Sequence, residues 1–199
     1  MDNEKLVNVL TNENNNMRSE VNILTKDINY CIFSFIALFA IIAGILIKAD
    51  SLLESTISIL AFIISQIEFI LIIFSISLLT GIFNLASYIA NIENKINHLT
   101  ENHMLFWESE ISKRQWGSGL LIFTHGSIWI FCGIVFIYLG FLSYSHSKNC
   151  WYLLVQIIEL IVIIIIMISL LKERSRVDKY IDKLGNDYQN KFKDDNCIE

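Results

Sequence analysis

Four long apolar segments constrain this 199-residue chain more than any other feature, because each is long enough to cross a bilayer. A helix needs about 20 apolar residues to span the hydrocarbon core. The predicted spans are residues 28–48, 57–83, 119–142 and 152–171. The chain contains no proline, the residue that most strongly interrupts a helix. The sequence therefore predicts an all-α membrane protein with four transmembrane helices.

The positions of lysine and arginine predict the orientation of these spans. If the spans alternate in direction, thirteen of the fifteen Lys and Arg residues lie on one side, in residues 1–27, 84–118 and 172–199. Positively charged segments stay in the cytoplasm, so both termini and the middle segment are predicted to be cytoplasmic. The expected location is the cell (inner) membrane. The 37 isoleucines and 17 asparagines favour a low-GC, bacterial genome.

Apolar periodicity continues beyond the membrane and predicts helical extensions into the cytoplasm. After the second span, alternating steps of four and three residues define a seam: Leu85, Ile89, Ile92, Ile96 and Leu99. Val177, Ile181, Leu184 and Tyr188 continue the fourth span in the same way, and residues 1–27 show a weaker version in which Asn14 intrudes. A seam among polar residues implies a partner helix in water. That partner belongs either to the same subunit or to a second copy, which would form a coiled coil.

Apart from Lys48, at the end of the first span, the predicted spans contain two acidic residues and one histidine: Glu68, His125 and Glu159. Gln156 lies one turn before Glu159 on the same helix face. A charge at the centre of a bilayer costs at least about 2.5–3.5 kcal/mol, so such residues usually face the bundle interior, a partner or water. These four residues are candidates for a polar pathway that carries protons, ions or water. The alternative is a set of hydrogen-bonded groups that only fixes the helix register.

The third span contains a glycine every seven residues: Gly119, Gly126, Gly133 and Gly140. Glycine allows two helix backbones to approach closely in a membrane, where the hydrophobic effect does not drive helix association. This stripe predicts a packing groove for a neighbouring helix, from the same subunit or from another copy.

Several functional classes are disfavoured. The chain has no recognisable catalytic motif, so an enzyme and a catalytic site are not expected, and no cofactor is implied. The four cysteines and four histidines do not have metal-ligand spacing, so no metal is expected. A net charge of −5 argues against direct binding of nucleic acid.

The favoured function is a membrane protein that self-associates and forms or gates a pore, or perturbs the bilayer. Its expected partners are the lipid bilayer and further copies of itself. The alternative is a non-catalytic membrane anchor or regulatory subunit that recruits a soluble cytoplasmic protein through its helical extensions. In outline, with four spans, an extended second helix and cytoplasmic tails, the chain resembles small membrane proteins that accompany bacterial antiviral systems. That likeness of outline implies a defence effector.

Overall fold

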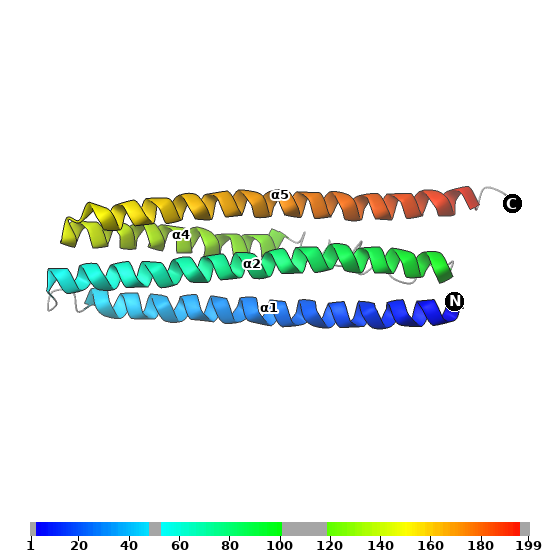
Figure 1. The fold of residues 1–199 in the computed structure, drawn as a ribbon, viewed down its shortest axis with the longest axis horizontal. Coiled ribbons are helices and arrows are strands. Elements are labelled where there is room, and N and C mark those ends of the chain that lie inside the picture. Colours follow the sequence, from blue (N-terminus) through cyan, green and yellow to red (C-terminus); the bar gives the residue numbers. More distant parts are fainter. Residues whose placement is uncertain (1–2, 48–52, 101–118, 196–199) are drawn as a thin grey trace. The chain divides into compact units, whose positions relative to one another are not determined.

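The computed structural model describes residues 3–47, 53–100 and 119–195, and it describes side chains for 3–47, 53–100, 129–181 and 183. Four helices account for almost all of this (Figure 1): α1 (Asn3–Ile47), α2 (Glu54–Thr100), α4 (Gly119–Ser147) and α5 (Cys150–Asp195). Among the described residues, only Leu53, Lys148 and Asn149 are not helical. All four helices are long and apolar enough to cross a membrane, which confirms the predicted fold class.

Helix α2 is continuous over 47 residues, as the uninterrupted apolar seam predicts. At a rise of about 1.5 Å per residue it is roughly 70 Å long, about twice what the hydrocarbon core requires. Gly81 lies in the middle of this helix without ending it. Because the chain lacks proline, every residue after the first turn can donate its backbone hydrogen bond to the helix.

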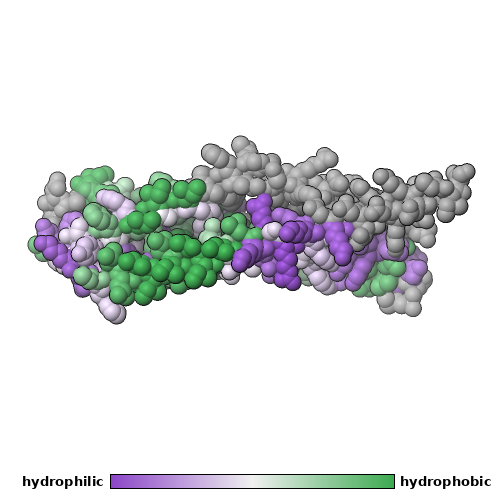
Figure 2. Space-filling model, turned by 90° about the horizontal axis from the view of Figure 1, so that it is seen from above, coloured by the Kyte–Doolittle hydropathy of each residue, from purple (hydrophilic) through white to green (hydrophobic). Residues whose placement is uncertain are grey.

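The chain divides into two compact units, which we call the span unit and the extension unit. The span unit comprises Asp27–Leu78 and Phe123–Ser169, and the extension unit comprises Met1–Lys26, Leu79–Ile122 and Leu170–Glu199. On the face shown in Figure 2, hydrophobic side chains dominate the surface of the span unit, whereas hydrophilic side chains dominate the described surface of the extension unit. This difference is what a membrane-embedded unit and a water-exposed unit require.

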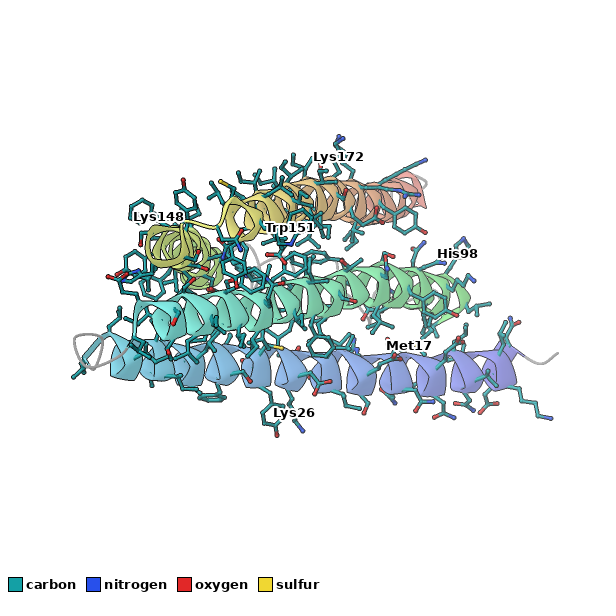
Figure 3. The ribbon with its side chains drawn as sticks, turned by 60° about the vertical axis from the view of Figure 1, so that its left-hand side comes forward. Met17, Lys26, His98, Lys148, Trp151 and Lys172 are labelled. Carbon is teal, nitrogen blue, oxygen red and sulfur yellow. The ribbon has the colours of Figure 1, made fainter. Side chains whose placement is uncertain are left out.

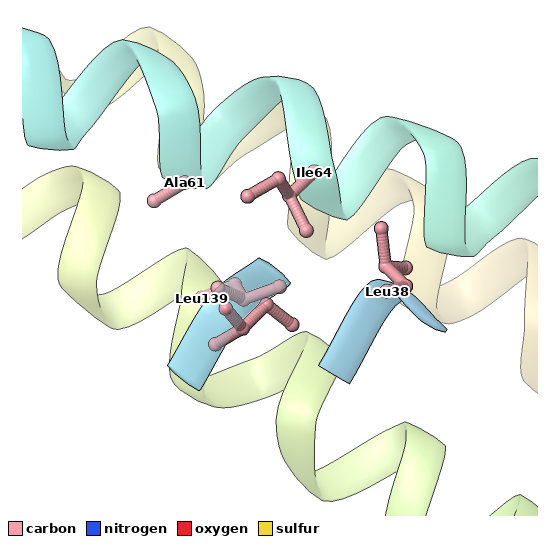
Figure 4. Close-up of a cluster of buried hydrophobic side chains, with 5 residues drawn as sticks. Leu38, Ala61, Ile64 and Leu139 are labelled. Carbon is pink, nitrogen blue, oxygen red and sulfur yellow. The ribbon is translucent and has the colours of Figure 1, made fainter. Parts of the chain in front are cut away.

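The core of the span unit lies where α1, α2 and α4 meet. Leu38 and Ile42 of α1 pack against Ala61 and Ile64 of α2 and against Leu139 of α4 (Figure 4). Aromatic pairs extend this contact: Phe35 with Trp129 and Phe39 with Phe131 join α1 to α4. Between α2 and α5, the rings of Phe62 and Tyr152 stack with centroids 4.6 Å apart. Helix α2 therefore contacts all three of its neighbours within this unit.

The predicted seam of α2 is covered inside the extension unit. Ile89, Ile92 and Ile96 are buried, and Leu85 and Leu99 are partly buried. On one side, Gly81 of α2 lies against Leu24 of α1, because a Cβ at position 81 would stand 3.3 Å from the Leu24 side chain. On another side, Ala90 packs with Val177 and Ile181 of α5. Leu184 and Tyr188 lie outside the residues with described side chains.

The amino-terminal segment is more regular than its sequence indicates. Asn14, Asn15 and Asn16 are unfavourable in helices, yet α1 is helical from Asn3 onward. Less exposed residues recur at steps of three and four along α1, namely Val7, Leu10, Asn14, Met17, Val21 and Leu24. Packing against α2 overrides the weak local propensity, and it buries Asn14 within the seam.

The turn between α4 and α5 is shorter than the sequence predicts. Helix α4 continues five residues past Leu142, to Ser147, which leaves Lys148 and Asn149 as the connection. Lys148 has a φ of 51°, a left-handed conformation that glycine adopts more readily than lysine. The side chain of Asn149 caps α5 by accepting a hydrogen bond from the backbone N–H of Trp151, at 3.0 Å.

This turn yields a stability prediction. Replacing Lys148 with Gly should raise the free energy of unfolding by up to about 1 kcal/mol, because it removes the cost of the left-handed conformation. Replacing Asn149 with Ala should lower the free energy of unfolding by about 1 kcal/mol, because the cap of α5 is lost. Denaturation of the purified protein in detergent measures both changes. A Lys148→Ala variant is the control, and stabilisation by Ala equal to that by Gly would contradict the explanation.

Candidate polar site within the spans

A line of polar side chains runs along one face of α2 inside the span unit. Ser58, Ser65, Glu68 and Ser75 are all buried, although they lie in a strongly apolar helix. Their spacing of seven, three and seven residues keeps them on one side of the helix. From Ser58 to Ser75 the line extends about 25 Å along the helix axis, against a hydrocarbon core of about 30 Å.

At one end of this line, Ser58 of α2 forms a reciprocal pair with Ser143 of α4. The Ser58 hydroxyl donates to the Ser143 carbonyl at 2.8 Å, and the Ser143 hydroxyl donates to the Ser58 carbonyl at 3.1 Å. Both side chains are almost wholly buried. In a bilayer such interhelical hydrogen bonds contribute to association, each by roughly 0.6–2 kcal/mol. This pair holds α2 and α4 together close to the ends of their apolar segments.

Farther along the line, two side-chain amides connect α2 to α5. The Gln156 amide donates to the hydroxyl of Ser65 at 2.8 Å, and that hydroxyl donates to the carbonyl of Phe62 at 2.8 Å. One turn farther along α5, the carboxyl group of Glu159 accepts a hydrogen bond from the side-chain amide of Gln66, at 3.1 Å. Gln156 and Glu159 are both buried. Two of the predicted polar residues therefore take part in one interhelical hydrogen-bonded contact.

Glu68 occupies a different environment. Its side chain has 0% exposure, and neither carboxyl oxygen has a hydrogen-bond partner among the described residues. Cys132 of α4, in the same unit, is also fully buried. Among the described side chains of the span unit, Glu68 thus has two buried oxygens without a hydrogen-bond partner, and Gln156 has one.

The structure describes the side chains of three of the four predicted pathway residues. Glu68, Gln156 and Glu159 all lie in the span unit, on two adjacent helices. The side chain of His125 lies outside the described residues. Gln66 and the Ser58–Ser143 pair were not predicted from the sequence. The signal for Gln66 was an amide within a long apolar block, but which helix it would face depends on tertiary packing.

The glycine stripe does not behave as one uniform groove. At Gly140 an added Cβ would stand 2.0 Å from the side-chain oxygen of Gln156. The amide of Gln156 can therefore occupy this position only because residue 140 has no side chain. At Gly133 an added Cβ would have no neighbour within 4 Å. Gly119 and Gly126 precede the residues with described side chains. Within one subunit no helix of the described part of the chain therefore approaches Gly133, beside which Cys132 and Phe136 are buried on α4, and close contact at that position stays a prediction for a helix of another copy.

A second polar cluster joins α1 to α2 in the extension unit. Arg18 forms an ion pair with Glu93 at 2.5 Å, and the Glu93 side chain is only 3% exposed. Tyr88 donates a hydrogen bond to Glu13 at 2.6 Å, and this bond raises the pKa of Tyr88 above its usual value. Glu93 and Asn97 are polar residues interspersed with the apolar seam, yet both are buried, because α2 has neighbours on more than one side.

The chemistry available in the span unit is that of carboxyl, amide and hydroxyl groups. Within the described part of the chain, no group of three His, Cys, Asp or Glu side chains could hold a metal ion. The amides and hydroxyls can both donate and accept hydrogen bonds, and the carboxyl groups can take up and release protons. No family model, curated protein or solved structure matches the chain, so functional inference rests on these residues.

Gly140 provides a test of the contact between α4 and α5. Replacing Gly140 with Ala should displace the Gln156 amide and break its bond to Ser65, which should lower the free energy of unfolding by about 1 kcal/mol. Replacing Gly133 with Ala is the matched control and should be nearly neutral. In a Gln156→Ala background, Gly140→Ala should have little further effect. Equal destabilisation by both alanine substitutions in the unmodified chain would refute the assignment.

The Arg18–Glu93 pair provides a test of the extension unit. Replacing Arg18 with Gln removes the charge that pairs with the buried Glu93 carboxylate, and should destabilise this unit by roughly 2 kcal/mol, less than for a fully buried pair because Arg18 is one-third exposed. Hydrogen exchange of backbone amides in residues 3–26 measures the effect as faster exchange. The exposed Lys5→Gln is the control. Unchanged protection in Arg18→Gln would show that the pair contributes no stability.

Proposed function

We propose that the protein self-associates in a membrane and forms or gates a pathway for protons or small ions. The observation that carries this proposal is Glu68, which is wholly buried in the span unit with neither carboxyl oxygen hydrogen-bonded among the described residues. A buried charge without a partner is costly, so the group requires a proton, a cation, water or a further polar residue. Intramembrane acids in such positions commonly belong to ion or proton pathways.

The polar line of α2 supports the same proposal. A pathway across a bilayer needs polar groups at successive depths, and the line from Ser58 to Ser75 covers most of the core thickness, at about 25 Å. Gln156 and Glu159 add donors and acceptors from α5 at intermediate depths. A purely structural set of hydrogen bonds would satisfy its members, as the Ser58–Ser143 pair does, whereas no described residue forms a hydrogen bond with the Glu68 carboxyl group.

Little of α5 is covered within one subunit, which leaves its apolar surface open to lipid or to a further copy. In the most apolar window of α5, only 6% of the residues are buried, compared with 39% for α2. The core of the span unit is filled by side chains such as Leu38, Ile64 and Leu139, so one copy offers narrow polar contacts rather than a wide pore. A wider pathway would require faces contributed by several copies.

Flux measurements in liposomes test the proposal. The full chain, reconstituted at known density, should dissipate a proton or potassium gradient faster than empty liposomes. Glu68→Gln should preserve expression, size and assembly but change the flux several-fold and alter its pH dependence, because the amide cannot release a proton. Glu54→Gln, an exposed substitution at the start of the same helix, is the matched control and should leave the flux unchanged.

Two results would overturn the proposal. One is flux through the native protein that does not exceed that of empty liposomes, measured under both a gradient and a membrane potential. The other is identical flux for the native chain, Glu68→Gln and Glu68→Leu. The first result would favour the alternative function, a membrane anchor, for which the buried three-helix contact of the extension unit is the supporting observation.

A further inference from the structure

The part of α5 in the extension unit carries four basic residues on one exposed face. We call this the basic stripe: Lys172, Arg176, Lys179 and Lys183, all exposed. They follow one another at steps of four, three and four residues. Since successive helical residues turn by about 100°, Lys172 and Lys183 point within about 20° of each other. The stripe is therefore a continuous line of positive charge.

The basic stripe faces away from the packed side of the helix. Val177 and Ile181, which are buried against Ala90 of α2, lie on the other side of α5. Ile181 points about 180° away from Lys172 on the same helical geometry. In Figure 3 the Lys172 side chain extends outward, away from α2. The stripe is thus not used in packing the extension unit.

The two nearby acidic residues whose side chains are described, Glu173 and Asp178, neutralise little of this charge. Glu173 pairs with Arg176 at 3.6 Å, but the Arg176 side chain is 81% exposed, so water screens the pair strongly. Asp178 pairs at 3.8 Å with Arg174, which is not part of the stripe. Lys172, Lys179 and Lys183 form no ion pair with another described residue, and all three side chains are exposed.

The stripe begins where the apolar segment of α5 ends. Leu171 is the last residue of the apolar run and Lys172 follows it directly. With a rise of about 1.5 Å per residue, Arg176 lies about 6 Å and Lys179 about 10 Å beyond Lys172. The headgroup region extends roughly 5–8 Å beyond the hydrocarbon core, and charges interact over a further 8–10 Å or so at physiological salt. At least three of the four basic residues are therefore within reach of the headgroups.

We propose that the basic stripe binds the headgroups of anionic phospholipids in the leaflet next to Lys172. Charge complementarity and the juxtamembrane position favour this occupant, because basic clusters directly after a span bind acidic lipids. The inference is independent of whether the span unit conducts ions, since it depends only on residues of the extension unit.

Competition between two lipids tests the inference. The full chain in detergent is mixed with phosphatidylglycerol and phosphatidylcholine of identical acyl chains, and native mass spectrometry counts the molecules of each lipid that remain bound. The native chain should retain phosphatidylglycerol preferentially, and this preference should weaken with rising ionic strength. Arg176→Gln/Lys179→Gln should reduce the preference at least about threefold, because two charges of the stripe are lost.

Two further variants separate the stripe from net charge and from misfolding. Lys5→Gln/Lys95→Gln removes the same charge from exposed positions elsewhere in the extension unit, and it should keep the preference. Arg176→Lys/Lys179→Arg conserves charge and should also keep it. Equal retention of the two lipids by the native chain would overturn the proposal and leave the stripe to solvent or to an acidic protein segment. An equal loss in the Lys5/Lys95 variant would overturn it too, because net charge would then explain the binding.

Discussion

The architecture depends first on the backbone hydrogen bonds of four long helices. Within a bilayer no water can satisfy a free N–H or C=O group, so each spanning segment must satisfy its own. Isoleucine-rich segments such as those of α2 and α5 have only moderate helix propensity in water, yet they are helical throughout their described length. The lack of proline lets α1, α2 and α5 remain helical well beyond the length that a membrane requires.

Helix α2 is the element on which the rest of both units is assembled. In the span unit it contacts α1 and α4 through apolar packing, α4 through the Ser58–Ser143 pair and α5 through two amide hydrogen bonds. In the extension unit it contacts α1 through the Arg18–Glu93 pair and α5 through Ala90. Its burial on several faces explains why polar residues of α2 end inside the protein, where each must find a partner or a function.

The two units handle buried polar groups differently. In the extension unit, the buried carboxylate of Glu93 on α2 forms an ion pair with Arg18 on α1. In the span unit, the described contacts of the polar line are neutral or involve a single acid, and Glu68 stands among them without a hydrogen bond from the described residues. Evolution can retain such a costly group for a task that a hydrophobic residue could not perform, which is the basis of the proposed ion or proton pathway. The basic stripe of α5 has the opposite property, because its charged side chains are exposed.

The sequence by itself determined the number of spans, the continuity of α2 and the seam from Leu85 to Leu99, because apolar length and periodicity are local properties of the chain. It also marked Glu68, Gln156 and Glu159 as unusual, since polar residues in apolar segments stand out without knowledge of their neighbours. Only the tertiary structure decided that Gln156 bonds to Ser65, that Gln66 bonds to Glu159 and that Gly140 rather than Gly133 makes room for a side chain. It also decided that Asn14, at a seam position of α1, and Glu93, between two seam positions of α2, are buried. The reason is that the sequence does not show which face of a helix will meet which neighbour. The rotation of each helix about its axis is fixed only when the side chains of neighbouring helices pack together.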